Sequence, residues 1–223
     1  MDVPAPPRPD RRHVRRQETI EAVLDVAVEV MAAQGVAGLT LGEVARRMGI
    51  RPPSLYGYFD GKHALYDALF ERGWALLVTG MRAEDELIAT AAAGEQLRLA
   101  SEFFVRWAVE HPGYAPLMFW RPVPGFAPSE AAYAPAREAM ALAANLMARL
   151  RAAGELRADV DLDVAMRTWT AWTSGVVSQQ LSNAPGEPYE TGTFSSTVPQ
   201  LAAMWLAHFG PRHPAPPHPE ETP

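Results

Sequence analysis

The chain has 223 residues, 48% of them apolar, which is enough for a buried core and excludes global disorder. It contains no cysteine, so disulfides, thiolate catalysis and thiol-based redox sensing are excluded. The net charge of −6 conceals a nearly balanced N-terminal part, with nine basic and eight acidic residues in 1–62, so we expect any polyanionic partner to bind there.

Proline and polar residues dominate both ends of the chain, which predicts a flexible basic arm over 1–14 and a disordered tail over 211–223. The first residues include no apolar stretch typical of a secretory signal. No segment approaches the roughly 20 apolar residues that a membrane-spanning helix requires. We therefore expect a cytoplasmic protein without a membrane partner.

Between the two ends, apolar residues recur at helical spacing and no convincing alternation of period two is present, so the chain is predicted to be all-α. A first helix is predicted over about 15–34, with Gly35 as its C-cap. The next helices are expected at 41–48, at 53–59 and directly after Asp60. Further helices are expected over about 83–111, with a break near Gly94, and over about 113–119, 128–153, 161–183 and 193–209.

Residues 41–60 have the pattern of a helix-turn-helix, although the same pattern also occurs where two helices only pack together. Thr40 and Glu43 are spaced as a capping box at the start of this motif. Ala45 is small where a second helix must cross closely, and Gly49 stands where the turn needs a left-handed residue. Its small core is expected to consist of Val44, Met48, Ile50, Leu55 and Phe59.

The helix expected at 53–59 divides its residues between two faces, with Leu55 and Phe59 turned inward. Pro53 disfavours helical geometry at Pro52, so this helix is expected to begin at Pro53 and to leave the N–H groups of Ser54 and Leu55 free for a phosphate. The outward residues, which are expected to enter the major groove of DNA, are Arg51, Pro53, Ser54 and Gly57.

Lys62, the only lysine of the chain, is expected in the first turn of the next helix, with Asp60 as its cap. A cation at a helix N-terminus opposes the helix dipole. A bound phosphate would explain why the cation is tolerated there, which is a second indication of a nucleic-acid partner.

Residues 15–65 resemble the N-terminal domain of the tetracycline-repressor (TetR) family of transcriptional regulators. The similarity includes T-L-x-x-V-A-x-x-M-G at 40–49 and S-L-Y-x-Y-F-x-x-K-x-x-L at 54–65. It implies base-edge contacts from residues around 51–57. It also implies phosphate contacts from Thr40, Tyr56, Tyr58 and Lys62.

Two residues depart from the family pattern. Arg51 stands where the family often has serine or threonine, and it could reach a guanine edge or a phosphate. Gly57 has no side chain, so direct base readout is expected to rest on few residues. Whether the basic arm contacts DNA or is only a solvated tail stays open, and its arginines are Arg8, Arg11, Arg12, Arg15 and Arg16.

Residues 95–209 carry most of the aromatic residues, which form either an ordinary packed core or the lining of an apolar ligand pocket. The segments 111–118 and 169–175 resemble a C-terminal domain class of the same family that has a Trp-His-Gly signature. Ser174 replaces that histidine here, so its role is not carried over. The residues expected to line the pocket are Phe103, Phe104, Trp107, Tyr114, Met118, Phe119, Leu142, Leu146, Trp169 and Trp172.

The helices expected at 161–183 and 193–209 are apolar on more than one face, so one face is free for a second subunit. The resemblance implies a homodimer in which these two helices of each protomer form a four-helix bundle. The interface residues are expected to include Val177, Leu181, Val198, Leu201 and Trp205.

Several constellations that would indicate a metal, a cofactor or catalysis are incomplete. Asp159, Asp161 and Asp163 alternate as in a calcium loop, but Val164 and Thr170 stand where that loop needs glycine and glutamate. These aspartates are expected to cap a helix start instead. The histidines form no spaced pair, and no nucleophile elbow or phosphate-binding loop is present, so we expect no cofactor, metal or catalytic activity.

These observations favour a homodimeric transcriptional repressor with a helix-turn-helix domain at 15–62 and a ligand-binding and dimerisation domain at 63–210. We expect a small apolar effector to release it from a nearly palindromic DNA operator. Activation of transcription stays open. A helical carrier or enzyme for an apolar metabolite is the alternative, but it leaves the pattern of residues 41–62 unexplained.

Overall fold

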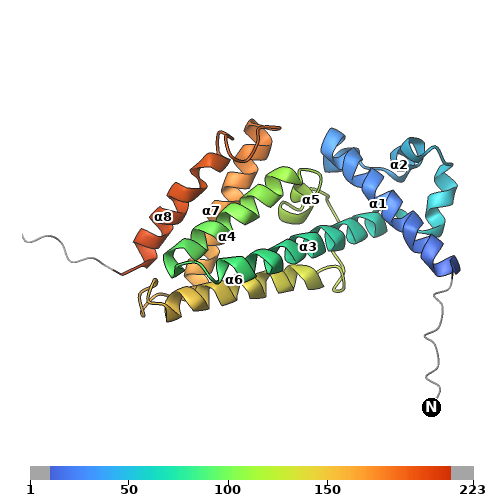
Figure 1. Cartoon of the computed structure of the whole chain (residues 1–223). Coiled ribbons are helices and arrows are strands. Elements are labelled where there is room, and N and C mark those ends of the chain that lie inside the picture. The colour runs from blue at the N-terminus through green and yellow to red at the C-terminus, as the bar shows by residue number, and fades with distance from the viewer. Residues whose placement is uncertain (1–10, 212–223) are drawn as a thin grey trace, which may run out of the picture. The chain divides into compact units, whose positions relative to one another are not determined.

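The structure is a computed structural model that describes residues 11–211. All of its described regular elements are helical, which confirms the all-α prediction for that part of the chain (Figure 1). They are α1 (Arg11–Gly38), α2 (Leu41–Met48), the 3₁₀ helix η1 (Pro52–Gly57), α3 (Gly61–Ile88), α4 (Ala93–Glu110), α5 (Ala115–Phe119), α6 (Ala134–Ala152), α7 (Leu162–Asn183), the 3₁₀ helix η2 (Ser195–Thr197) and α8 (Val198–Phe209).

The chain folds into two compact units that do not follow its linear order. The first unit contains the described residues up to Leu76 together with 111–137, and the second contains 77–110 with the described residues from Glu138 onward. The boundary expected at residue 62 is not a structural break, because α3 is one continuous helix that contributes to both units. The helix-turn-helix therefore shares its unit with α5 and with the connection between α5 and α6.

Helix α1 begins four residues earlier than expected, so residues 11–14 belong to its first turn rather than to a flexible arm. Nothing between Arg11 and Gly35 is a proline or a glycine, so the backbone can stay helical throughout this stretch. Gly35 has φ 72° and interrupts the helix, in agreement with its expected role as a terminator. Residues 1–10 and 212–223, including Arg8 and most of the expected tail, lie outside the described residues.

The break expected near Gly94 within the helical segment 83–111 is present, and it separates two helices. α3 extends to Ile88 and α4 begins at Ala93, so the break precedes Gly94. The hydroxyl of Thr90 donates to the carbonyl oxygen of Leu87 over 2.7 Å, and such local bonds compete with helix continuation. Prolines in the first turns of α6 and α8, Pro135 and Pro199, accompany starts at Ala134 and Val198 that are later than expected.

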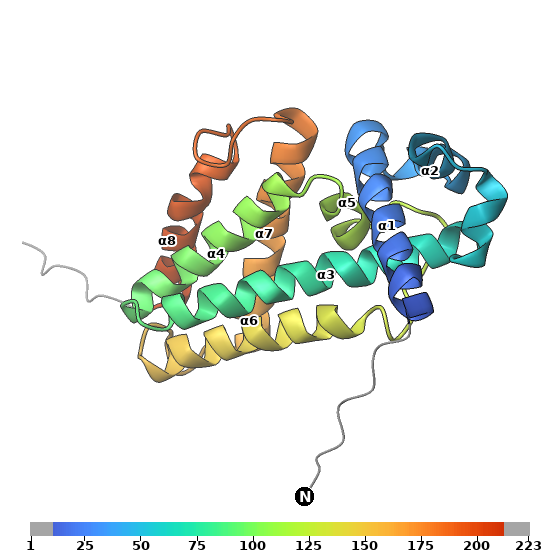
Figure 2. The same cartoon turned by 45° about the vertical axis from the view of Figure 1, so that its right-hand side comes forward.

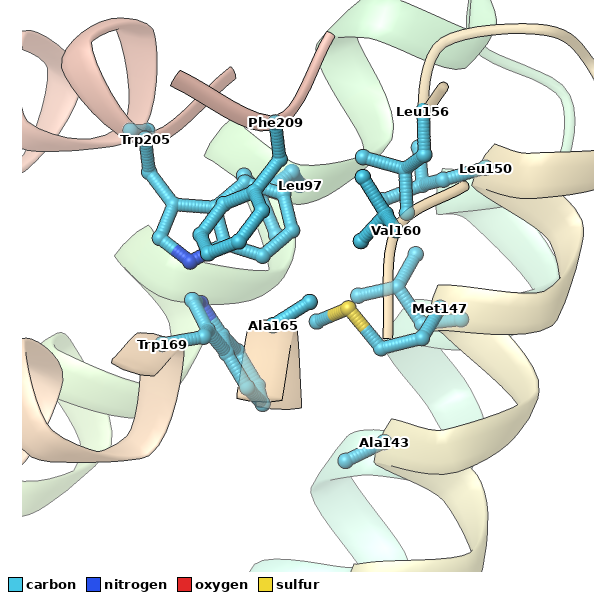
Figure 3. Close-up of a cluster of buried hydrophobic side chains, with 12 residues drawn as sticks. Leu97, Ala143, Met147, Leu150, Leu156, Val160, Ala165, Trp169, Trp205 and Phe209 are labelled. Carbon is cyan, nitrogen blue, oxygen red and sulfur yellow. The ribbon is translucent and has the colours of Figure 1, made fainter. Parts of the chain in front are cut away.

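The core of the second unit is formed by α4, α6, α7 and α8, and α4, α7 and α8 lie side by side (Figure 2). Trp169 of α7 donates from Nε1 to Oγ of Ser101 in α4 over 2.8 Å, and both side chains are buried. The Trp205 and Phe209 rings of α8 lie 4.6 Å apart between centroids, close to Leu97 of α4 (Figure 3). Burial of these large rings, at about 25 cal/mol per Å² of apolar area, is the main stabilising contribution here.

Three of the five residues expected at the dimer interface are instead buried within the chain. Val177 and Val198 have no exposed surface and Trp205 has 4%. These residues are used internally because α7 and α8 pack against α4. Leu181 and Leu201 are only half-buried and remain available for a partner.

The core of the first unit is centred on the first turns of α3. Leu65 and Tyr66 are fully buried, and the Tyr66 hydroxyl donates to the carbonyl oxygen of Val36 over 2.9 Å. Leu55 and Phe59 join this core as expected. Ile50 does not, because it is 37% exposed at the turn between α2 and η1.

Candidate functional site

The turn between α2 and η1 is held by the two local devices expected from the sequence. Thr40 Oγ1 accepts a hydrogen bond from the Glu43 backbone N–H over 3.0 Å and so caps α2. Gly49 is left-handed, with φ 68° and ψ 24°, and its N–H is directed at the carbonyl oxygens of Ala45 and Arg46. The geometry of a helix-turn-helix therefore follows from residues within about ten positions of one another.

The second half of the expected capping box is absent, because the Glu43 carboxylate has other partners in the described chain. It accepts hydrogen bonds from Arg46 Nε over 2.8 Å, from Arg47 Nε over 3.0 Å and from Gln34 Nε2 over 3.3 Å. The bonds from Arg46 and then Arg47 lower the pKa of Glu43 to about 2. Glu43 thus holds two arginine side chains against the surface of α2.

The element after the turn is a 3₁₀ helix that starts at Pro52, not the expected helix from Pro53 to Phe59. Two consecutive prolines fit the first positions of this short helix, where a missing N–H leaves no bond unmade. The N–H of Ser54 donates to the carbonyl oxygen of Arg51 over 2.9 Å. It is therefore not the free phosphate-binding group that the sequence suggested.

The outer surface of η1 carries most of the residues expected to contact DNA. Tyr56 is 61% exposed, while Leu55 on the inner side has no exposed surface. Tyr58 is half-buried, and Thr40 is exposed at the start of α2. The remaining exposed residues on this surface are Arg51, Pro53, Ser54 and Gly57.

Arg16 of α1 braces the end of η1, a contact that the sequence analysis did not anticipate. Its Nη1 donates to the carbonyl oxygen of Gly57 over 2.9 Å, and its guanidinium carbon lies 5.1 Å from the centre of the Tyr58 ring. A surface hollow beside this contact is lined by Arg12, His13, Arg15, Arg16, Thr19 and Tyr58. The helical spacing of these α1 residues could have predicted that they share one face. The contact was missed because part of this segment was expected to be a flexible arm.

Lys62 lies in the first turn of α3, as expected, and is half-buried. Its Nζ is 5.1 Å from the centre of the Tyr66 ring, one turn further along the helix. This cation–π contact stabilises the lysine within the chain, so the unfavourable helix dipole at this end does not by itself require a phosphate.

The ten aromatic and apolar residues expected to line one pocket do not surround a single pocket. Phe103, Phe104, Leu142, Leu146 and Trp169 line a cavity of about 40 Å³ in the second unit. Trp107 and Trp172 belong to the same unit but do not line that cavity, and Tyr114, Met118 and Phe119 belong to the first unit. For Tyr114, Met118 and Phe119 the prediction fails because the segment 111–137 packs in the first unit. The lining residues that were missed are Met81, Glu84, Asp85, Ile88, Ala100 and Ala143.

The cavity of the second unit is mainly apolar, with charged groups on the α3 side. Asp85 accepts a hydrogen bond from Arg149 Nη2 over 2.5 Å, and Arg149 Nε also approaches Gln96 Oε1 at 3.4 Å. A volume of about 40 Å³ holds only a few water molecules, whereas pockets for drug-sized ligands measure roughly 300–1,000 Å³. Any larger ligand must therefore displace the lining side chains.

Residues 11–211 contain no group of three or more histidine, aspartate or glutamate side chains that could hold a metal ion. Asp161 caps α7, accepting from the N–H groups of Asp163 over 2.8 Å and Val164 over 3.3 Å, as the interpretation of the aspartate cluster predicted. Within the same range, no helix is both long and apolar enough to cross a membrane.

An exposed 3₁₀ helix after a glycine turn, flanked by arginines and a lysine, defines the head of a helix-turn-helix DNA-binding protein. Comparison with known families agrees: "Bacterial regulatory proteins, tetR family" matches residues 23–69, and "Tetracyclin repressor-like, C-terminal domain" matches residues 97–199. The two matches together cover more than half of the chain. The chain belongs to the tetR family of DNA-binding transcriptional regulators.

Individual relatives agree with this assignment. The uncharacterized HTH-type transcriptional regulator YobS of Bacillus subtilis is 33% identical over 96 residues, which are 43% of this chain and 49% of that protein. The tetracycline repressor protein class C of Escherichia coli is 45% identical over 51 residues, 23% of each chain. The matches thus span about half or less of the length of these curated relatives.

Among solved structures, the fold is similar to the transcriptional regulator FadR from Bacillus subtilis, solved in complex with stearoyl-CoA. The TM-score is 0.68 at 16% identity, and the similarity covers 84% of this chain and 97% of FadR. At this identity the similarity concerns the fold alone.

Proposed function

We propose that the protein is a cytoplasmic homodimeric repressor that leaves a nearly palindromic operator when a small apolar effector binds its second unit. The observation that carries the proposal is the exposed outer surface of η1, fixed by Gly49 at one end and by Arg16 at the other. A short element held at both ends can present base-reading groups with little loss of conformational entropy.

Within this proposal, Arg51 and Ser54 read base edges in the major groove, because their side chains are exposed and polar. Pro53 and Gly57 let the backbone approach the groove floor closely. The groups proposed to contact phosphates are the side chains of Thr40, Tyr56, Tyr58 and Lys62. Few base contacts imply that part of the specificity comes from the spacing of two heads.

The proposed dimer uses the outward faces of α7 and α8 rather than their buried sides. Met204 of α8 is 67% exposed, and Val164 of α7 is 40% exposed. Gly175 of α7 has nothing within 4 Å of where a Cβ would stand. An exposed methionine and a small residue on adjacent helices fit a four-helix bundle with a second copy. Leu181 and Leu201 complete this proposed interface.

The effector is proposed to enter the cavity beside Phe103, Leu146 and Trp169. FadR from Bacillus subtilis was solved with an acyl-CoA, which supports an apolar effector for this fold without identifying one. Since the cavity is small, the effector must move residues of α3 such as Met81. Because α3 is continuous from Lys62 to Ile88, such a movement can reach the DNA-binding residues. A coupling of about 1–3 kcal/mol lowers operator affinity roughly 5- to 150-fold.

Selection of bound fragments from random duplex DNA by the purified full chain tests the proposal. We expect a nearly palindromic sequence, two protomers per duplex and an affinity that falls steeply with salt. A thermal-shift screen with apolar compounds then identifies effectors, and one of them must weaken operator binding. A chain that ignores duplex DNA in dilute salt but still binds apolar compounds would favour the alternative, a helical carrier or enzyme.

A further inference from the structure

A second cavity lies in the first unit and has no part in the proposed effector site. Its volume is about 150 Å³. It is lined by Phe70 of α3, by residues of α5 and by the connection between α5 and α6. Engineered cavities of about this size in protein cores bind a single benzene ring.

The walls of this cavity are aromatic and held in place by one another. The Phe70 and Tyr133 rings are stacked, with centroids 5.7 Å apart and planes inclined by 19°. The Phe119 and Trp74 rings are arranged edge to face with centroids 5.6 Å apart. The centroids of the Phe126 and Tyr66 rings are 5.5 Å apart. A flat aromatic ligand would find ring faces and edges already arranged around it.

Arg121 is the charged residue of this lining. Its φ of 47° makes it the one non-glycine residue in the described range with a left-handed backbone, a conformation that L residues rarely adopt. It makes no ion pair or hydrogen bond with any other described residue. Arg121 is exposed, and a guanidinium beside a cavity lined by aromatic rings suits a carboxylate, which it can bind through two parallel N–H groups.

A further polar group nearby lacks a partner. Trp74 is 8% exposed, and its buried Nε1 makes no hydrogen bond within the described chain. Its ring contacts two residues of the cavity wall, Phe70 at 6.2 Å and Phe119 at 5.6 Å between centroids. Trp74 does not itself line the cavity, so its ring supports the aromatic wall and its N–H group is not a ligand contact.

We propose that this cavity binds a single-ring aromatic carboxylate, with the ring packed against Phe70, Phe119 and Tyr133 and the carboxylate on Arg121. The site is independent of the effector cavity, and its existence does not depend on operator binding. It lies in the unit that carries η1. Asp67 of α3 accepts from the N–H and the hydroxyl of Ser129 over 2.7 Å each, which holds the connection beside the cavity against the same helix.

Isothermal titration calorimetry of the full chain without DNA tests whether the ligand must carry a carboxylate. The probe is benzoate, and benzyl alcohol is its neutral counterpart. We expect one benzoate per chain and at least tenfold weaker binding of benzyl alcohol. Arg121→Gln should weaken benzoate at least tenfold and leave benzyl alcohol unchanged. Arg121→Gly, which suits the backbone but lacks the cation, should match Arg121→Gln in affinity and melt no earlier than wild type. Arg137→Gln, a change outside the cavity, should alter neither ligand.

Equal binding of benzoate and benzyl alcohol by the wild type, or retained benzoate binding by both Arg121 variants, overturns the proposal. A second arm locates the ring. Naphthoate has two rings and should bind more weakly than benzoate. Met118→Ala enlarges the cavity, so this difference in affinity should become smaller or change sign in the variant. Variants are compared only after their thermal melting shows that they are folded. An unchanged ratio of naphthoate to benzoate affinity in folded Met118→Ala places the ring elsewhere and also overturns the proposal.

Discussion

Arg16 and Gly57 are 41 residues apart in the sequence, yet the guanidinium of the first donates to the carbonyl oxygen of the second over 2.9 Å. The same guanidinium covers the Tyr58 ring. Helix α1 therefore fixes the end of the element that we propose to read DNA. Arg16 therefore acts as a positioning residue for η1.

Arg16→Met should loosen η1 while keeping the length of the side chain. A lost hydrogen bond is worth about 1 kcal/mol, so we expect the ratio of operator to random-DNA affinity to fall about fivefold. Arg15→Met removes the same charge from the same hollow and is the matched control. Fluorescence anisotropy with both duplexes measures the ratio. Equal loss in the two variants would reduce the role of Arg16 to its charge.

Lys62→Ala should weaken binding to all DNA sequences alike. If Lys62 neutralises one phosphate, the slope of log affinity against log salt falls by about one per protomer. Lys62→Arg keeps the cation and should retain the slope. Because Lys62 also covers Tyr66, the melting temperature of each variant must be measured alongside. An unchanged slope in a folded Lys62→Ala protein would contradict the phosphate contact.

Arg51→Ala should relax the preference for particular operator positions. A guanidinium that reads a guanine edge contributes about 1–3 kcal/mol of discrimination at that base pair. Affinity for a set of operators with single base changes measures the effect. If instead all operators lose affinity by the same factor, Arg51 contacts the backbone.

Gly80→Ala should obstruct the effector cavity. A Cβ at this position of α3 would lie 2.6 Å from Cζ of Phe103, so the ring must move, and it already lines a cavity of only about 40 Å³. Alanine gains about 1 kcal/mol in helix propensity, which offsets part of the cost of moving the ring. We expect about tenfold weaker binding of an apolar effector, measured by titration. Gly94→Ala, in the first turn of α4, is the control and should bind the effector normally.

Glu43→Gln should make stability less dependent on acid pH. The folded-state pKa of Glu43 is about 2, below its ordinary value of 4.5, because Arg46 and Arg47 donate hydrogen bonds to the carboxylate. The contribution of Glu43 to stability is therefore complete above about pH 4.5 and is lost as the pH falls toward 2. The difference in melting temperature between wild type and Glu43→Gln should be largest near pH 6 and shrink below pH 4.5.

The parts of the fold that sequence predicted well are those fixed by neighbouring residues. The cap from Thr40, the left-handed turn at Gly49 and the aspartate cap at Asp161 each depend on bonds within a few positions. The inward burial of Leu55 and Phe59 followed from helical spacing alone. The 3₁₀ form of η1 was missed because two adjacent prolines leave the choice of hydrogen bonds to the surrounding packing.

The failures concern partners that are distant in sequence. The sequence of a helix with two apolar faces does not indicate which face packs within its own chain. For this reason the dimer interface was predicted to include three residues that are buried inside the chain, Val177, Val198 and Trp205. The predicted pocket lining combined residues of both units for a similar reason. Phe104 and Tyr114 are only ten residues apart in the sequence but belong to different units. The Arg16 contact needed the path of α1 relative to η1, which no local pattern records.

The return of residues 111–137 to the first unit means that the DNA-binding head is not one contiguous piece of chain. Gly73 admits Met118 and Tyr114 so closely that a Cβ there would be 2.6 and 2.8 Å from them. A fragment ending at residue 76 would lose these neighbours and leave Trp74 uncovered. Chimeras that exchange heads between relatives therefore have to transplant both stretches together, since either one alone brings only half of a shared packing surface.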